Sequence, residues 1–261
     1  MRRFATALLV LGTVLPLLPL LVWSFSSSWR YPAMVPEQGT DRGLSILASS
    51  DVLGALGIST LIASSVAVLA CAIGLPAGRV IGLHRFRGRH ALQFLLLAPV
   101  IVPGLAVTLG LQIFFVRFGL SDTIPGVVLV QLILTVPYAA IILGAAFEGF
   151  DIDLERQSRS LGAGALRTTF LVTIPILAPA LLATALLTFL ISWSEYILTL
   201  LIGGGQVQTL PLLLFAAIGS SDTTAAAALA IVVVVPPVVL VLLFSRAFTW
   251  RSSTLMGLAR A

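Results

Sequence analysis

Charged residues are confined to short segments of this 261-residue chain, and the long stretches between them contain no Asp, Glu or Arg. Only 10% of the residues are charged, whereas an ordinary soluble domain has about 25%. A soluble fold could not cover its surface from so small a stock. The mean hydropathy of +1.11 excludes disorder, which requires low hydrophobicity. The chain is therefore predicted to be an all-α, polytopic membrane protein.

Seven uncharged runs are long enough for a membrane-crossing helix, which needs roughly 20 residues. They cover residues 4–29, 52–78, 90–116, 123–147, 168–194, 196–221 and 223–245. The sixth run is interrupted by a Gly- and Gln-rich stretch at 203–208, and each of its apolar halves is too short to span. We interpret this run as an external re-entrant segment, because irregular backbone at membrane depth must be covered by protein or line a wet cavity. Six transmembrane helices remain.

The distribution of arginine orients the six crossings. With the N-terminus in the cytoplasm, the cytoplasmic segments hold 12 of the 15 basic residues, and only Arg30, Arg42 and Arg117 lie outside. A seventh crossing would move the three C-terminal arginines outside and weaken this bias. Because Lys and Arg are enriched in cytoplasmic loops, both ends of the chain are predicted to be cytoplasmic.

The small number or absence of cysteine, lysine and histidine excludes several kinds of functional site. Cys71 is the single cysteine, so neither an intramolecular disulfide nor a cysteine-based metal cluster can form. The sequence has no lysine and hence no Walker A loop, so energy from ATP would have to come from another chain. His84 and His90 lie in one short loop with no third metal ligand nearby. We expect no catalytic, cofactor or metal site in this chain.

The N-terminal apolar run and the net positive charge are both explained by insertion of the chain in a membrane. The N-terminal apolar run resembles a signal peptide, but it exceeds the usual 7–15 residues of the hydrophobic part, and we expect it to stay as the first span. The net charge of +5 comes from arginines at span ends, where topology and anionic lipid explain them. We therefore expect membrane lipid, and no nucleic acid, as a partner.

The cytoplasmic loop at 148–167 differs from the short basic loops elsewhere. Asp151 and Asp153 are candidate helix N-caps, and Glu155 precedes Arg159 by four residues, the favourable order for a surface ion pair on a helix. Gly162 permits a sharp turn after this helix, as does Gly164. Four apolar residues lie on the otherwise polar element: Leu154, Leu161, Leu166 and Phe170. The local pattern fits an interfacial helix, and it also fits an exposed ledge for a partner protein.

The spacing in this loop resembles the EAA loop of permease subunits of ATP-binding-cassette (ABC) importers. That pattern is Glu-Ala-Ala, three residues, Gly, nine residues, an aliphatic residue, one residue, an aliphatic residue and Pro. Here Gly162 takes the Gly position, and Val172, Ile174 and Pro175 take the last three. The chain departs from the pattern at 156–158, where Arg-Gln-Ser occupies the Glu-Ala-Ala positions and Glu155 comes one residue early.

The resemblance extends over residues 52–245. Ser192–Ile197 is similar to the Ser-Trp-(Asn/Asp)-Glu-(Phe/Tyr) string of these permeases, and 203–211 to their Gly…Thr-Leu-Pro segment. Among subfamilies the chain most resembles the second permease of polyamine-type systems. Thiamine-, phosphonate-, sulfate- and iron-type permeases share the same strings, so these substrates stay open as alternatives.

The resemblance implies a type I importer fold in a bacterial inner membrane. It implies a dimer of permease subunits, more readily a heterodimer, on an ATPase dimer that holds ATP and Mg²⁺, with an external substrate-binding protein. The ATPase-coupling residues that it implies are Asp153, Leu154, Glu155, Arg156, Arg159, Leu161, Gly162, Ala163 and Pro175. Rigid-body rocking of the helices would give alternating access.

Two carboxylates near the outer ends of spans are candidates for the substrate path. Acids at membrane depth mark functional sites by default, but both Glu195 and Asp222 also suit solvated helix capping. For a cationic substrate, Glu195 with Trp193 and Tyr196 would offer charge and cation–π attraction.

Small residues and prolines suggest how the spans pack and bend. Gly, Ala, Ser and Thr are dense at 54–78 and 183–188, which permits close helix approach. Five prolines could kink spans and turn carbonyls toward a cavity, or could be tolerated without such a role. They are Pro99, Pro103, Pro137, Pro236 and Pro237.

Two other functional classes fit the sequence less well than the importer permease does. An ion-coupled secondary transporter usually shows internal repeats and ionisable residues within its spans, and the uncharged runs contain no acid or arginine. An intramembrane enzyme would need a constellation such as Ser/His, and both histidines lie together in one loop. We therefore predict a non-catalytic permease for a small polar solute such as a polyamine.

Overall fold

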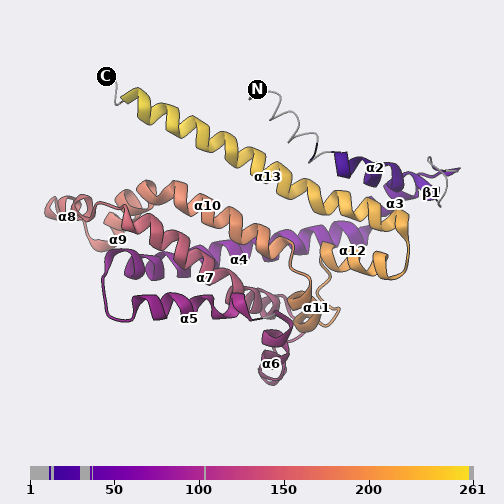
Figure 1. The fold of residues 1–261 in the computed structure, drawn as a ribbon, viewed down its shortest axis with the longest axis horizontal. Helices are drawn as coiled ribbons and strands as arrows, with labels where there is room; N and C mark the ends of the chain where they lie inside the picture. Colours follow the sequence, from indigo (N-terminus) through magenta and orange to yellow (C-terminus); the bar gives the residue numbers. More distant parts are fainter. Residues whose placement is uncertain (1–11, 13–14, 30–35, 37, 103, 259–261) are drawn as a thin grey trace. The chain divides into compact units, whose positions relative to one another are not determined.

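The computed structural model describes residues 12, 15–29, 36, 38–102 and 104–258, and this part of the chain is almost entirely helical (Figure 1). The predicted all-α fold is confirmed, apart from one short pair of strands.

The chain divides into two compact units, and two long helices belong to both. The first unit combines residues 1–59 with 208–239, and the second combines 60–207 with 240–261. Both α4 (Ser50–Leu83) and α13 (Thr223–Leu258) begin in the first unit and end in the second.

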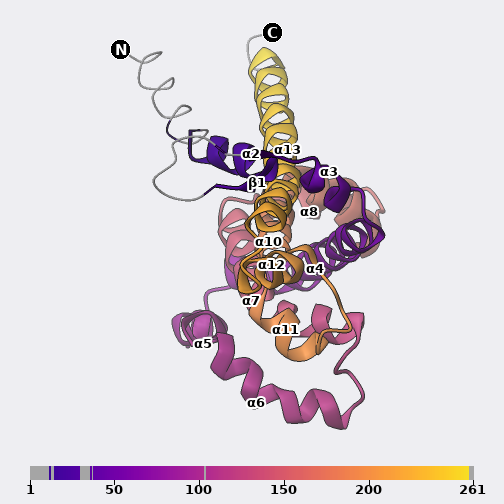
Figure 2. The same cartoon turned by 90° about the vertical axis from the view of Figure 1, so that its right-hand side faces the viewer.

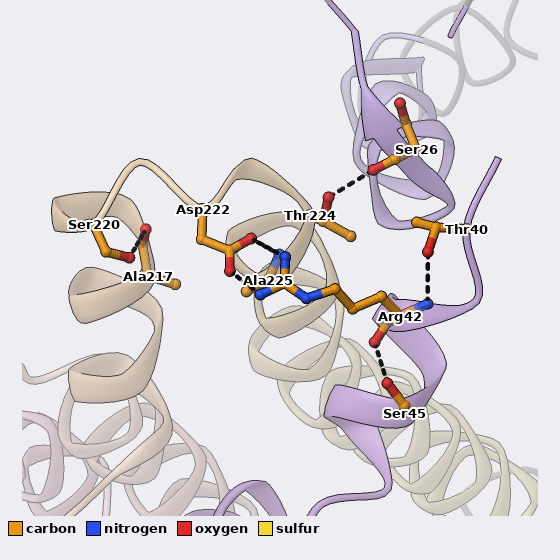
Figure 3. Close-up of polar contacts among 9 residues, drawn as sticks. All are labelled: Ser26, Thr40, Arg42, Ser45, Ala217, Ser220, Asp222, Thr224 and Ala225. Atoms are coloured by element: carbon orange, nitrogen blue, oxygen red, sulfur yellow. Dashed lines mark hydrogen bonds and ion pairs between the residues drawn. The ribbon is translucent and has the colours of Figure 1, made fainter. Parts of the chain in front are cut away.

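The first unit holds short elements around the beginnings of α4 and α13. They are η1 (Leu15–Leu17), α2 (Leu18–Ser24), β1 (Ser26–Ser28), β2 (Gln38–Gly39), α3 (Arg42–Leu47) and α12 (Leu210–Gly219). β1 and β2 pair antiparallel with an irregular register. The hydroxyl of Thr224 in α13 donates to the carbonyl of Ser26 in β1 at 2.6 Å (Figure 3). The amide of Leu210 donates to Ser59 Oγ at 2.9 Å. These bonds attach the strand to α13 and the start of α12 to α4.

The described part of the first predicted span is helical only as far as Ser24. The Ser24 hydroxyl donates to the carbonyl of Leu21 at 2.8 Å, and the serines at 26–28 form β1. Serine side chains compete with the backbone for hydrogen bonds, so a run without charges need not continue as a helix. Most of residues 4–14 lie outside the described residues.

The second unit is built on α7, which has the largest number of buried residues among its helices. Its elements are α5 (Arg89–Ile101), α6 (Gly104–Arg117), α7 (Ile124–Glu148), α8 (Ile152–Ser160), α9 (Ala165–Thr168), the π turn η2 (Thr169–Thr173), α10 (Ile174–Trp193) and α11 (Ile197–Gly203). Thr123 caps α7, accepting a hydrogen bond from the amide of Gly126 at 3.1 Å. α7 and α10 lie side by side (Figure 1).

The run at 90–116, expected to be one crossing, forms two helices. α5 has 13 residues and α6 has 14, and Val102 between them is extended, with φ −73° and ψ 134°. A residue that precedes a proline avoids the α conformation, and Pro103 follows Val102. The break between α5 and α6 is visible in Figure 2. Pro103 itself lies outside the described residues.

Four helices in the described part of the chain are long and apolar enough to cross a membrane: Ser50–Leu83, Ile124–Glu148, Ala165–Trp193 and Thr223–Phe244. The run at 196–221 contains α11 and α12, and α11 ends where Gly204 adopts a left-handed φ of +52°. Six crossings, cytoplasmic ends and the re-entrant position of 196–221 stay predictions.

Three glycines at every fourth position let α4 touch the backbone of α7. A Cβ built on Gly74 would lie 2.6 Å from Ala139 Cβ, one on Gly78 2.8 Å from the Gly144 nitrogen, and one on Gly82 2.4 Å from the Gly144 oxygen. Small residues at this spacing are typical of membrane helix pairs that pack closely.

We expect Gly78→Ala to destabilise the protein because its methyl group would collide with backbone atoms of α7 that cannot move independently. Overpacking of this kind costs about 1–3 kcal/mol, and thermal unfolding in detergent would measure the loss. Gly57→Ala is the matched control on the same helix, because a Cβ there meets no atom within 4 Å. Equal melting temperatures for the two variants would contradict the close packing of α4 on α7.

Candidate functional site

The loop after α7 folds as a capped helix followed by a glycine turn. Asp151 is the N-cap of α8, and its carboxylate accepts a hydrogen bond from the Asp153 amide at 2.9 Å. At the other end, the amide of Gly162 donates to the carbonyl of Arg159 and the amide of Ala163 to that of Ser158, at 3.0 and 3.1 Å. These two bonds, with φ of +88° at Gly162, form a Schellman cap. The predicted helix and sharp turn are both present.

The turn exposes an apolar surface, which we call the 161–163 ledge after its residues. The Leu161 side chain is 88% exposed, and Leu166 is 77% exposed. A groove of about 500 Å³ runs beside the ledge. It is lined by Leu154, Gln157, Ser158, Leu161, Gly162, Ala163, Arg167, Leu171 and Val172.

The opposite side of α8 carries a buried carboxylate. Glu155 was expected in a surface pair with Arg159, but the residue is only 2% exposed. Its closest cation is Arg79 of α4, whose two terminal nitrogens each lie 2.6 Å from a carboxylate oxygen. Thr173 donates its hydroxyl at 2.6 Å, whereas Arg159 remains 3.6 Å away. The predicted pair with Arg159 is present at this longer distance, but its surface location is wrong for Glu155, because α8 rests with this face against α4 and η2.

The surroundings of Glu155 keep its carboxylate ionised. The hydrogen-bonded guanidinium of Arg79 lowers the pKa of Glu155, burial opposes this shift, and the Thr173 hydroxyl adds to the lowering. The stabilisation is therefore fully present above the ordinary glutamate pKa and is lost only as the pH falls through the lowered value. Removing one partner would lower the free energy of unfolding by about 3 kcal/mol. This is the lower end of the range for buried pairs, because the Arg79 side chain is 31% exposed.

The other coupling candidates lie on the exposed side or at the re-entry into α10. Asp153 and Arg156 form an exposed pair at 2.8 Å, which contributes little to stability. Pro175 follows the π turn η2 at the start of α10. In a regular helix a proline cannot donate a hydrogen bond to the carbonyl four residues earlier, and its ring crowds that carbonyl. A π turn beside Pro175 is one of the irregularities that accompany bends in helices.

A second candidate region lies at the end of α10. Glu195 lines a cavity of about 300 Å³ together with Pro99, Tyr138 and apolar side chains. One carboxylate oxygen of Glu195 accepts a hydrogen bond at 2.9 Å from the amide of Leu198, which lies in the first turn of α11. Neither Trp193 nor Tyr196 lines this cavity in the described part of the chain. Trp193 is buried and stacks on Phe189 with ring centroids 5.6 Å apart.

Asp222, the other acidic candidate, caps a helix and pairs with an arginine of the same unit. Its carboxylate accepts from the Ala225 amide at 3.1 Å and faces both terminal nitrogens of Arg42, the closer at 2.5 Å (Figure 3). The arrangement suits solvated capping. No group of three metal-ligating side chains occurs among the residues that the structure describes.

Comparison with protein families identifies this architecture. Residues 74–253 match the family described as binding-protein-dependent transport system inner membrane component, so the match covers more than half of the chain. The chain belongs to this family. It is a permease subunit of an ABC importer and an inner-membrane protein, as the sequence predicted.

Two relatives and a solved structure show the range of the similarity. The putrescine transport system permease protein PotI of Escherichia coli K12 is 27% identical over 210 residues, 78% of this chain and 74% of PotI. The molybdate/tungstate permease protein WtpB of Pyrococcus abyssi is 31% identical over 147 residues, 55% of this chain and 58% of WtpB. The crystal structure of a bacterial ABC transporter for the acidic polysaccharide alginate matches with a TM-score of 0.71 at 15% identity, over 95% of both chains. The predicted type I permease fold is confirmed.

Sequence reasoning missed three residues of the permease that complete these sites. Arg79 and Thr173 bind Glu155, and Tyr138 lines the Glu195 cavity. The buried Gln131 also ties three helices together, donating to Thr199 at 3.0 Å and accepting from Ser192 at 2.5 Å. A lone polar residue within an apolar run, such as Gln131, was the signal available in the sequence.

We expect Gly162→Ala to loosen the turn after α8, because a left-handed conformation costs a residue with a Cβ about 1–2 kcal/mol. Gly164→Ala is the matched control: neither glycine has an atom near its absent Cβ, but Gly164 has an ordinary φ of −66°. Hydrogen exchange of the amides at 161–164 would accelerate in Gly162→Ala alone. Identical exchange in both variants would contradict the Schellman cap.

Proposed function

We propose that this permease couples to a separate ATPase dimer through α8 and the 161–163 ledge, and that the ATPase holds the ATP and Mg²⁺. The observation that carries the proposal is the two-sided character of α8. One side holds Glu155 against α4 and η2, and the other presents Leu161 at the end of a rigid cap.

The exposed apolar ledge supports a protein partner. A Leu side chain that is 88% exposed beside a groove of about 500 Å³ gains stability when another protein covers it. The predicted topology places this loop in the cytoplasm, where the ATPase of an importer works. Gly162 and Pro175 fit the EAA pattern in spacing, and Gly162 makes the turn that such a loop needs.

For the substrate we propose a small cation of the polyamine class. The support is Glu195, a carboxylate that has no ion-pair partner among the described side chains and lines an otherwise largely apolar cavity with Tyr138. A carboxylate in such a cavity attracts ammonium groups and repels oxyanions. PotI, at 27% identity, is named for putrescine, whereas WtpB is named for molybdate and tungstate. Thiamine and iron remain the cationic alternatives, and phosphonate and sulfate the anionic ones.

We further propose that a second, different permease chain completes the path, as the polyamine-type resemblance implies. An external binding protein would deliver the solute, in keeping with the name of the family.

We expect Leu161→Glu to prevent copurification of the ATPase, because it places a charge in the centre of the apolar ledge. The measurement is a mild-detergent pull-down of the tagged permease from its host, with the ATPase quantified by mass spectrometry. Leu161→Met keeps an apolar side chain of similar volume and should retain the ATPase. Retention of the ATPase by Leu161→Glu would contradict the proposed interface, and its absence from the unaltered permease would contradict ATPase coupling altogether.

We expect Glu195→Gln to raise the apparent KM for putrescine uptake by about tenfold, the size of one lost charge-assisted contact. Glutamine keeps an oxygen that can accept the hydrogen bond from the Leu198 amide, so the variant removes charge with little effect on the fold. Asp51→Asn, which removes an acid from the first turn of α4, is the control and should leave uptake unchanged. Equal KM values in the Glu195→Gln variant and the unaltered protein would contradict the cation site.

A further inference from the structure

Side chains from two other elements bind the carboxylate of Glu155 in α8. Arg79 comes from α4, Thr173 from η2 at the start of α10, and Glu155 from α8. Arg79 also lies over the ring of Phe147 in α7, with its guanidinium carbon 5.8 Å from the ring centroid. We call the trio Arg79, Glu155 and Thr173 the clamp.

The clamp attaches α8 to α4 and η2, and it also fixes the rotation of α8 about its own axis. The planar guanidinium of Arg79 binds both carboxylate oxygens at 2.6 Å in a fork, and Thr173 binds one of the same oxygens from another direction. Glu155 cannot turn without breaking bonds to two elements. Apolar side chains at these positions would hold α8 by contact but would leave its orientation loosely specified.

The clamp also lies on the path that a force on α8 would take. The 161–163 ledge is at the end of α8, about two helical turns from Glu155. The chain from α8 to α10 passes through a glycine turn and η2, which could absorb a displacement before it reaches α10. The clamp provides a direct connection to α4 and to the start of α10.

We propose that Arg79, Glu155 and Thr173 are positioning residues that transmit displacement of α8 to α4 and α10. This inference rests on the proposed coupling to an ATPase, and it assigns Glu155 a role within the permease rather than a contact with the partner.

The single cysteine offers a native reporter for the movement. Cys71 of α4 is half-buried, and its sulfur lies 3.9 Å from the Leu181 carbonyl of α10. A change in the spacing of α4 and α10 should therefore alter how readily N-ethylmaleimide reaches the Cys71 thiol. The readout requires no substrate and is confined to one residue of this chain.

The experiment compares Cys71 labelling rates in the copurified permease–ATPase complex with ATP and vanadate against ADP. In the unaltered permease we expect the two rates to differ by about fivefold or more, within the range of allosteric coupling between sites. Glu155→Gln should bring their ratio close to one. Arg79→Lys, which keeps the charge but loses the fork, should give an intermediate ratio. Arg89→Gln, which removes a different ion pair of the same unit, should keep the full ratio.

A double variant separates positioning from stability. Arg79→Met with Glu155→Leu replaces the ion pair by apolar packing and leaves no unpaired buried charge, so it should fold even where Glu155→Gln does not. The clamp predicts a ratio near one for this variant although it still binds the ATPase. A full ratio in the double variant, or no nucleotide effect in the unaltered complex, would overturn the clamp. Failure of the unaltered permease to bind any ATPase would instead overturn the proposed function on which it rests.

Discussion

A membrane helix gains little by hiding apolar side chains from lipid, so contacts between its backbone and its neighbours have to stabilise the bundle. This permease meets that constraint with glycines and with a few buried polar bonds. Gly74, Gly78 and Gly82 bring α4 onto the backbone of α7, Gln131 joins α7 to α10 and α11, and the clamp holds α8. The sites described above depend on the rigidity that these contacts provide.

The small number of polar groups also explains how one short helix can serve both the structure and the coupling that we propose. α8 has an exposed ion pair between Asp153 and Arg156 that contributes little, and a buried carboxylate that contributes a specific orientation. The Schellman cap then ends the helix within one residue and leaves Leu161 exposed. A capped helix with an exposed apolar end suits the ATPase coupling that we propose for this permease.

Local patterns in the sequence predicted local structure well, and contacts between distant residues could not be predicted from them. The N-cap at Asp151 and the turn at Gly162 follow from residue types within one helix, and both were foreseen. The break after Val102 could have been foreseen from Pro103, but the apolar run around it suggested a continuous crossing. The burial of Glu155 could not be foreseen, because its partner Arg79 is 76 residues away and nothing in the spacing relates them. Trp193 adjoins Glu195 in sequence, yet it stacks on Phe189 in α10, whereas Tyr138 of α7 lines the cavity.

Site-specific photo-cross-linking in native membranes tests most directly whether the 161–163 ledge contacts an ATPase, as we propose. A photoreactive amino acid at position 161 should form an adduct with a P-loop ATPase. The same group at position 113, a highly exposed site on α6, should form none. An ATPase adduct from 161 alone is the predicted result. No adduct from 161, or equal adducts from both positions, would contradict the account.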